Sequence, residues 1–137
     1  MELSENQVEL RDAAEQACER AYAPYSHFRV GAAVRSASGR IYSGCNVEIA
    51  SYPLGLCAER NAIFSGVSAE GPGIQLLEIA IATAHGKVAA PCGACRQVLH
   101  EFGPQATVIL CGLDSIEQFA VAELLPHPFG PDDLKKA

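Results

Sequence analysis

The segment LLEIAIATAHGKVAAPCGACRQVLHEF, residues 76–102, decides the fold because it joins a buried strand to a helix. Residues 76–84 are almost continuously apolar, which is typical of a central strand that is covered on both faces. Pro91 suits the first turn of a helix, and we expect this helix to run to about Phe102, before Gly103-Pro104 ends it. A strand followed by a helix in this way predicts an α/β architecture.

The flanking segments extend this pattern in both directions. Ser4 begins a capping-box pattern ahead of a helix whose apolar residues recur at helical spacing up to Pro24. Alternating segments that start at Phe28 and at Ile41, with a turn between them, predict a hairpin. The remaining predicted elements are a helix at 57–66, a strand at 106–111, and an edge strand with a short helical turn within 115–129. We therefore expect one domain over residues 1–137, a three-layer α/β/α sandwich with a mixed, mostly five-stranded sheet.

Composition and charge exclude several classes of protein. The chain has 137 residues, 49% of them hydrophobic, so it can bury a core without a disulfide or a metal. Its net charge is −6, from ten basic and sixteen acidic residues, which argues against binding to nucleic acid or to an anionic membrane. The sequence contains no apolar run of about 18 residues, so it predicts no membrane span. The N-terminus lacks a signal-peptide pattern. We therefore expect a cytoplasmic protein, in which six cysteines point to metal binding or catalysis rather than to disulfides.

The motif PCGAC, residues 91–95, contains two cysteines at CxxC spacing. Such a pair occurs in redox proteins, in structural zinc sites and in catalytic metal sites. Cys57 stands at the start of the preceding predicted helix, so two helix starts could bring it to the same sheet edge as Cys92 and Cys95. A structural zinc site uses four protein ligands, whereas a catalytic site uses three and leaves a position for water. The remaining cysteines are interpreted as small, buried core residues: Cys18, Cys45 and Cys111.

The residues that follow Cys57 fit the catalytic interpretation. Glu59 lies close enough to take a proton from a metal-activated water and return it to a leaving group. Three thiolates leave Zn²⁺ with a net negative charge, and Arg60 could compensate by donating hydrogen bonds to them. Taken alone, Glu59 could merely stabilise a helix N-terminus and Arg60 could be a solvated charge. Their position beside three cysteines favours the catalytic roles.

The combination of Cys-Ala-Glu at 57–59 with Pro-Cys-x-x-Cys at 91–95 is the signature of zinc deaminases of nucleobases. Beyond this signature, most of the chain resembles the small homotetrameric cytidine deaminases of the cytidine/deoxycytidylate deaminase superfamily. Four ordered segments carry the resemblance: AYAPYSHFRVGAAV (21–34), SGCNVEIASYPLGLCAERNAI (43–63), PCGACRQVLHEF (91–102) and ELLPHPF (123–129). The resemblance implies a cytidine deaminase-like fold and the hydrolytic chemistry of that family.

The implied reaction is the hydrolytic deamination of cytidine and deoxycytidine to uridine and deoxyuridine plus ammonia, in pyrimidine salvage. The resemblance implies one Zn²⁺ per chain, held by Cys57, Cys92 and Cys95. An activated water would attack C4 of cytosine while Glu59 carries protons to N3 and to the leaving amino group. The resemblance also implies a homotetramer that acts on a free nucleoside.

Further residues acquire implied roles from the same resemblance. Arg60 and Gln97 would steady the thiolates. Phe28 would pack against the pyrimidine, and the Ala58 backbone N–H would contact the base carbonyl. Asn46 and Glu48 would hydrogen-bond the ribose 3′-hydroxyl. Tyr52 and Phe129 would complete sites, partly from neighbouring subunits.

The sugar-side residues also have a physical interpretation. Asn46 and Glu48 are two positions apart, so they lie on one side of an extended segment. A carboxylate accepts a hydrogen bond from a hydroxyl and repels a phosphate, which favours a free nucleoside over a nucleotide or a polynucleotide. Taken alone, Asn46 could be a turn residue, and Phe28 and Phe129 could be core residues.

Three alternatives to a cytidine deaminase stay open at this point. One is a deaminase of a cytosine-containing antibiotic such as blasticidin S, which the sugar-side residues disfavour. Another is a non-enzymatic zinc-binding module, closed by a fourth cysteine, which the position of Glu59 disfavours. The third is a thiol redox protein.

Overall fold

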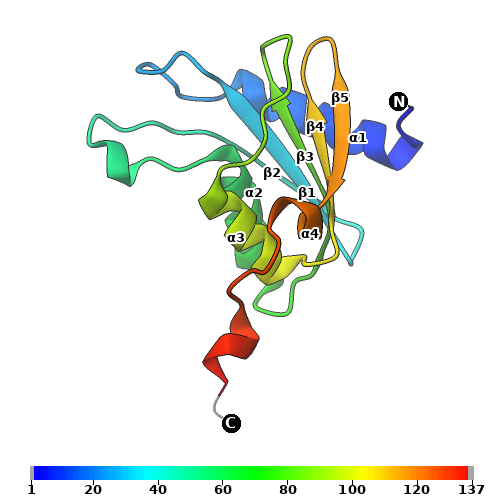
Figure 1. Cartoon of the computed structure of the whole chain (residues 1–137). Helices are drawn as coiled ribbons and strands as arrows, with labels where there is room; N and C mark the ends of the chain where they lie inside the picture. The colour runs from blue at the N-terminus through cyan, green and yellow to red at the C-terminus, as the bar shows by residue number, and fades with distance from the viewer. Residues whose placement is uncertain (1, 136–137) are drawn as a thin grey trace.

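A five-stranded mixed sheet forms the middle layer of the molecule (Figure 1). The computed structural model describes residues 2–135. The strands of the sheet are β1 (Val30–Ser36), β2 (Ile41–Cys45), β3 (Leu76–Thr83), β4 (Thr107–Cys111) and β5 (Ile116–Ala120). Their order is β2-β1-β3-β4-β5; β3 and β4 are parallel, and the other neighbours are antiparallel. The predicted mixed sheet is confirmed, with the apolar segment that begins at Leu76 as its central strand.

Helices cover both faces of this sheet, which makes the three layers (Figure 1). Helix α1 (Glu5–Glu19) packs on one face through a small-residue cluster that includes Ala33 and Ala80. Helices α2 (Ala58–Glu70) and α3 (Gly93–Phe102) pack on the other face against larger residues such as Ile81. Shorter turns complete the chain: η1 (Tyr52–Leu54), α4 (Val121–Leu124) and η2 (Pro131–Leu134).

Helix α1 begins at the capping box that the sequence predicts. The Ser4 hydroxyl accepts a hydrogen bond from the backbone N–H of Gln7, whose side chain accepts one from the backbone N–H of Ser4. The helix lies very close to β1 because Gly31 has no side chain. A Cβ atom at Gly31 would lie 2.0 Å from the carbonyl oxygen of Ala14.

Helix α2 is longer than the sequence predicted. We expected it to end at Gly66, but this glycine is buried inside the helix, where an added Cβ would lie 2.9 Å from Ile74 and 3.1 Å from Tyr42. The glycine is therefore a packing residue. The helix instead ends at Gly71, whose φ of 89° is a conformation that glycine adopts without strain.

Two other predicted boundaries are also shifted. Pro91 lies just ahead of α3, because Cys92 is the N-cap residue, so the proline is not within the first turn. Strand β1 begins at Val30, and Phe28 therefore lies in the preceding loop with its side chain partly exposed. Cys45, expected in the core, is only half-buried at the end of β2.

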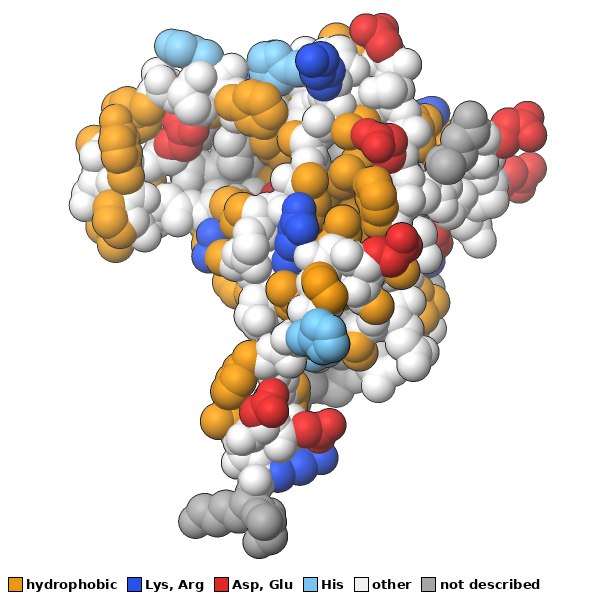
Figure 2. All heavy atoms as spheres, viewed as in Figure 1, with side chains coloured by type: hydrophobic (Ala, Val, Ile, Leu, Met, Phe, Trp, Pro, Cys, Tyr) orange, Lys and Arg blue, Asp and Glu red, His pale blue; other side chains and the backbone are white. Residues whose placement is uncertain are grey.

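The arrangement of the elements brings the starts of α2 and α3 together near the end of β3 that leads into α3 (Figure 1). The loop that carries η1 and the C-terminal segment both project from this body (Figure 1, Figure 2). Within residues 2–135, none of the helices has the length and apolar character needed to cross a bilayer.

Candidate active site and metal centre

Three cysteine sulfurs meet where α2 and α3 begin. The Sγ atoms of Cys57, Cys92 and Cys95 all lie within 4.8 Å of one another. Cys57 is the N-cap residue of α2, Cys92 is the N-cap residue of α3, and Cys95 lies one turn into α3. The convergence predicted from the sequence is therefore confirmed.

The three sulfurs form a suitable donor set for zinc. Thiolates are the soft ligands that Zn²⁺ prefers, and three of them leave a fourth position free. Cys92 is exposed, Cys57 is half-buried and Cys95 is buried, so one side of the group faces solvent. In the described part of the chain, no further Cys, His, Asp or Glu joins this group. The donor set thus fits an open metal site better than a closed structural one.

The other three cysteines lie outside the metal group. The Cys18 thiol donates to the carbonyl oxygen of Arg29, and Cys111 is buried at the end of β4. The burial predicted for these two cysteines is confirmed. Each of the six cysteines in the chain is free of disulfides.

Positive charge lies next to Cys57. The Arg60 guanidinium donates to the Cys57 Sγ at 3.3 Å, as the sequence suggested. The pKa of Cys57 is lowered to about 5, foremost by a hydrogen bond from Cys95 and further by Arg60. The N-terminus of α2 adds its partial positive charge at the same place. Cys57 is therefore prepared to be a thiolate.

Glu59 is buried next to this group of thiols. Its residue is only 5% exposed, although it belongs to the first turn of α2. Burial raises the pKa of the Glu59 carboxyl, and the negative charge of Cys57 raises it further. A carboxyl in this position can hold a proton and release it, which is the property that a general acid–base group needs.

A cavity of about 650 Å³ opens beside the sulfur group. A volume of this size is typical of small-molecule sites. Its lining includes five of the residues that the sequence singled out: Asn46, Glu48, Tyr52, Cys57 and Arg60. The predicted sugar-side residues and one predicted metal ligand therefore face the same space.

Asn46 and Glu48 also organise the loop that precedes β1. Asn46 Nδ2 donates to the carbonyl oxygen of Phe28, and Asn46 Oδ1 accepts from the backbone N–H of Val30, each at 2.8 Å. Glu48 accepts hydrogen bonds from the backbone N–H groups of Tyr25 and Ser26 and from the Ser26 hydroxyl. The hydrogen bonds from Ser26 lower the pKa of Glu48, which keeps this carboxylate charged.

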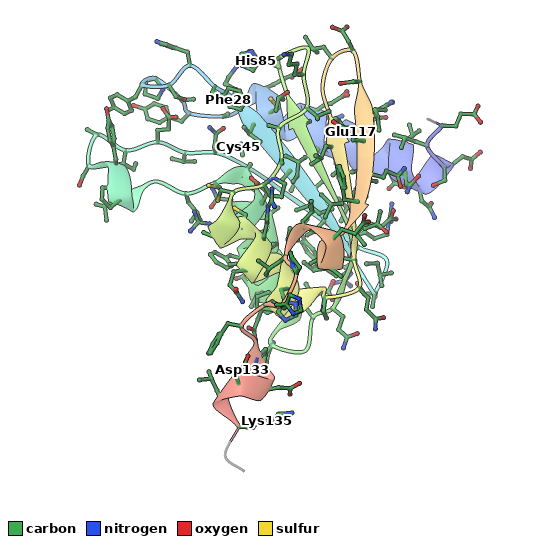
Figure 3. The ribbon with its side chains drawn as sticks, in the orientation of Figure 1. Phe28, Cys45, His85, Glu117, Asp133 and Lys135 are labelled. Atoms are coloured by element: carbon green, nitrogen blue, oxygen red, sulfur yellow. The ribbon has the colours of Figure 1, made fainter. Side chains whose placement is uncertain are left out.

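Phe28 lies next to a residue that the sequence did not single out as functional. Its ring stacks on the imidazole of His85, with the ring centroids 4.7 Å apart and the planes inclined by 14° (Figure 3). His85 lies in the loop that follows β3. The side chain is exposed, but it covers one face of Phe28.

Gln97 and Phe129 are joined by a hydrogen bond. Gln97 Nε2 donates to the carbonyl oxygen of Phe129 at 2.6 Å, and no cysteine is among its hydrogen-bond partners in residues 2–135. Gln97 thus anchors the C-terminal segment to α3, while its expected role beside the thiolates stays a prediction. The Phe129 side chain points outward, with 58% of the residue exposed.

Tyr52 and Ala58 occupy contrasting positions. Tyr52 is 72% exposed on the projecting loop, in edge contact with the ring of Tyr25. Ala58 is fully buried in the first turn of α2, next to Cys57. Its backbone N–H is one of the helix-start groups that have no partner within the helix.

Comparison with known proteins agrees with this geometry. Residues 4–111 match the family described as "Cytidine and deoxycytidylate deaminase zinc-binding region". The chain is 45% identical over 127 residues to the cytidine deaminase of Mycobacterium tuberculosis, which covers 93% of this chain and 92% of that protein. It is also 45% identical over 124 residues to the cytidine deaminase of Sporosarcina psychrophila, covering 89% of this chain and 90% of that relative.

Solved structures show the same likeness. The crystal structure of cytidine deaminase from Burkholderia pseudomallei superposes with a TM-score of 0.84 and 43% identity, covering 93% of this chain and all (100%) of that one. The class of protein that the fold and the site define is thus a zinc-binding deaminase of the α/β sandwich type. The chain belongs to the cytidine and deoxycytidylate deaminase family.

Proposed function

We propose that this protein is a zinc-dependent cytidine deaminase, which converts cytidine and deoxycytidine to uridine and deoxyuridine with release of ammonia. The observation that carries the proposal is the position of buried Glu59 beside three converging thiols at the edge of a ligand-sized cavity. Relatives that align over most of the chain are named cytidine deaminases.

We propose that Cys57, Cys92 and Cys95 hold one Zn²⁺ per chain. Zinc, when bound, supplies a Lewis acid that lowers the pKa of a water molecule toward 7 and makes it a nucleophile at neutral pH. Arg60 and the starts of α2 and α3 offset the negative charge of three thiolates.

Glu59 moves the protons of the reaction. Its carboxylate takes a proton from the attacking water and delivers it to N3 of cytosine, which makes C4 more electrophilic. It then takes the proton of the new C4 hydroxyl and passes it to the exocyclic amino group, so that the C4 carbonyl forms as the C4–N bond breaks and ammonia leaves. A buried carboxyl suits this role because burial raises its pKa toward the neutral range, where it can both accept and donate a proton.

Four further residues orient the nucleoside. The Ala58 N–H donates to the base carbonyl, and Phe28 packs against the pyrimidine ring. Asn46 and Glu48 hydrogen-bond the ribose 3′-hydroxyl at the cavity wall. Because Glu48 is a carboxylate, it favours a hydroxyl and disfavours a phosphate, so the substrate is a free nucleoside.

The exposed aromatic residues support an assembly of several chains. Tyr52 lies on the projecting η1 loop and Phe129 on the C-terminal segment, where Figure 2 shows hydrophobic side chains at the surface. We propose that residues 1–137 form one catalytic domain and that four copies form a homotetramer, with these two residues completing neighbouring sites. Six free thiols fit a reducing compartment, so we place the enzyme in the cytoplasm, in pyrimidine salvage.

A substrate panel tests the proposed function. Purified protein should contain about one zinc per chain, and it should convert cytidine and deoxycytidine, seen as a fall in ultraviolet absorbance. The 3′-monophosphates should be poor substrates because Glu48 faces the position of the 3′-hydroxyl. Conversion of blasticidin S in place of cytidine would favour the antibiotic deaminase. A metal content of one per chain with no turnover of any of these compounds would support the non-enzymatic module.

A further inference from the structure

The stack between Phe28 and His85 follows from the register of the sheet. Strands β1 and β3 are antiparallel, and Val30 pairs with Thr83 at the end of their ladder. Two residues before Val30 is Phe28, and two residues after Thr83 is His85. The two rings therefore occupy opposite positions in the continuation of the ladder, where side chains project to the same face and meet. The labelled rings lie side by side in Figure 3.

The backbone on the His85 side is fixed independently of the stack. The carbonyl oxygen of His85 accepts a hydrogen bond from the backbone N–H of Leu113 at 2.8 Å. The Thr83 hydroxyl donates to the carbonyl oxygen of Lys87 at 3.1 Å, which closes the loop around His85. The imidazole is thus held by a loop that is tied to the β4–β5 turn.

The backbone on the Phe28 side is fixed as well. Asn46 binds the carbonyl oxygen of Phe28, and the Phe28 N–H donates to the Ser26 hydroxyl at 3.0 Å. These bonds place the Cα atom but leave the ring free to turn about its side-chain torsions. The nearly parallel imidazole, whose centroid lies 4.7 Å from that of the Phe28 ring, limits this rotation.

We propose that His85 is a positioning residue that covers one face of Phe28 and orients the ring so that the opposite face receives the pyrimidine. Phe28 is still 39% exposed beside the imidazole, so ring surface remains for a flat ligand. This inference rests on the proposed function, in which Phe28 packs against the base. His85 needs no contact with the substrate for this role.

The test compares three variants of the full-length, zinc-loaded protein. His85→Ala removes the ring and should raise the KM for cytidine about threefold to tenfold, the range expected for one aromatic pair, while kcat changes less than twofold. His85→Phe keeps a ring in place and should restore the wild-type KM. Lys87→Ala, an exposed change in the same loop, should behave like the wild type. Calorimetry with uridine should show the same order of affinities without turnover.

Three results would contradict a positioning role for His85. An unchanged KM and uridine affinity in His85→Ala would overturn the inference. It would also fail if His85→Phe were as impaired as His85→Ala, or if kcat fell with KM unchanged. Wild-type protein that neither converts cytidine nor binds uridine would overturn the proposed function and this inference together, whereas an active wild type with an unaffected His85→Ala variant overturns this inference alone.

Discussion

The two ends of helix α2 each carry a glutamate, and the two carboxyl groups have opposite environments. Glu59 in the first turn is buried next to thiols, and burial raises its pKa. Glu70, the last residue of the helix, accepts hydrogen bonds through one oxygen from three hydroxyls: Ser36, Ser38 and Tyr42. These hydrogen bonds lower the pKa of Glu70, and the bond from Ser36 has the largest effect. One carboxylate is thus stabilised in its charged form, while the other is kept ready to exchange a proton.

This difference supports the proposal that Glu70 serves structure and Glu59 serves chemistry. The Glu70 cluster joins α2 to β1, β2 and the turn between them, because Ser36 ends β1 and Tyr42 belongs to β2. No such set of hydroxyl donors fixes the charge of Glu59 among the described residues. A carboxylate held by several hydroxyl donors rigidifies a fold, whereas a buried carboxyl with a raised pKa is suited to proton transfer.

The sharpest test of the comparison is the same substitution at each end of α2. Glu59→Gln should keep the bound zinc and lower kcat by roughly 10²–10⁴-fold, because an amide cannot carry the proton. Glu70→Gln is the matched control and should keep the wild-type kcat. Steady-state kinetics with cytidine and metal analysis of both variants provide the measurements. Near-wild-type turnover by Glu59→Gln would rule out its role as proton carrier.

A second test concerns the charge that balances the thiolates. Arg60→Gln removes the guanidinium that donates to Cys57 and should weaken zinc binding about 10- to 100-fold, the usual effect of losing a group that supports a metal ligand. Competition with a chromogenic chelator measures this affinity. Arg20→Gln, at the exposed C-cap of α1, is the control and should leave it unchanged. Equal zinc affinities in the two variants would show that Arg60 does not support the metal.

A smaller effect is expected from Glu70→Gln on the thermal stability of the protein. Glu70→Gln replaces a charged acceptor of three hydroxyl groups by a neutral one, so its melting temperature should be lower than that of the wild type at pH 7. Calorimetry at one fixed protein concentration measures the difference, because assembly makes melting temperatures depend on concentration. An unchanged melting temperature would mean that the cluster contributes little to the fold.

The smallest effect is the pH dependence of the difference in melting temperature between the wild type and Glu70→Gln. The pKa of Glu70 is lower in the folded chain than its ordinary value of 4.5, so its contribution is complete above pH 4.5. The contribution is lost as the pH falls through the folded-state pKa, because the proton then binds the unfolded chain more readily. The gap in melting temperature between wild type and Glu70→Gln should stay constant at neutral pH and narrow below about pH 4.5. A gap that widens on acidification would contradict the assignment.

The fold and the metal ligands could be predicted from the sequence because their signals are local or strongly patterned. The continuous apolar run that starts at Leu76 defined the central strand, and two short motifs defined the sulfur group. The length of α2 could not be predicted in the same way. Gly66 looks like a helix terminator in sequence, but tertiary packing under Tyr42 and Ile74 makes it a helix-interior residue.

The missed contacts are those that depend on register or on the path of the tail. The stack of His85 on Phe28 requires the pairing of β1 with β3, which adjacent sequence does not specify. With that register known, the two positions are seen to be opposite. The bond from Gln97 to Phe129 likewise depends on how the C-terminal segment returns along α3.

The starts of the three long helices differ in how they are closed. Helix α1 has a complete side-chain cap from Ser4, whereas α2 and α3 begin at Cys57 and Cys92 without any side-chain cap bond. A missing cap typically costs a helix about 1 kcal/mol. The first turns of α2 and α3, which carry the three cysteines of the metal group, therefore lack the stabilisation of a side-chain cap. Their rigidity depends on what the sulfur atoms bind. Loss of metal should accordingly lead first to fraying of the N-termini of α2 and α3, while the face of the sheet covered by α1 stays intact.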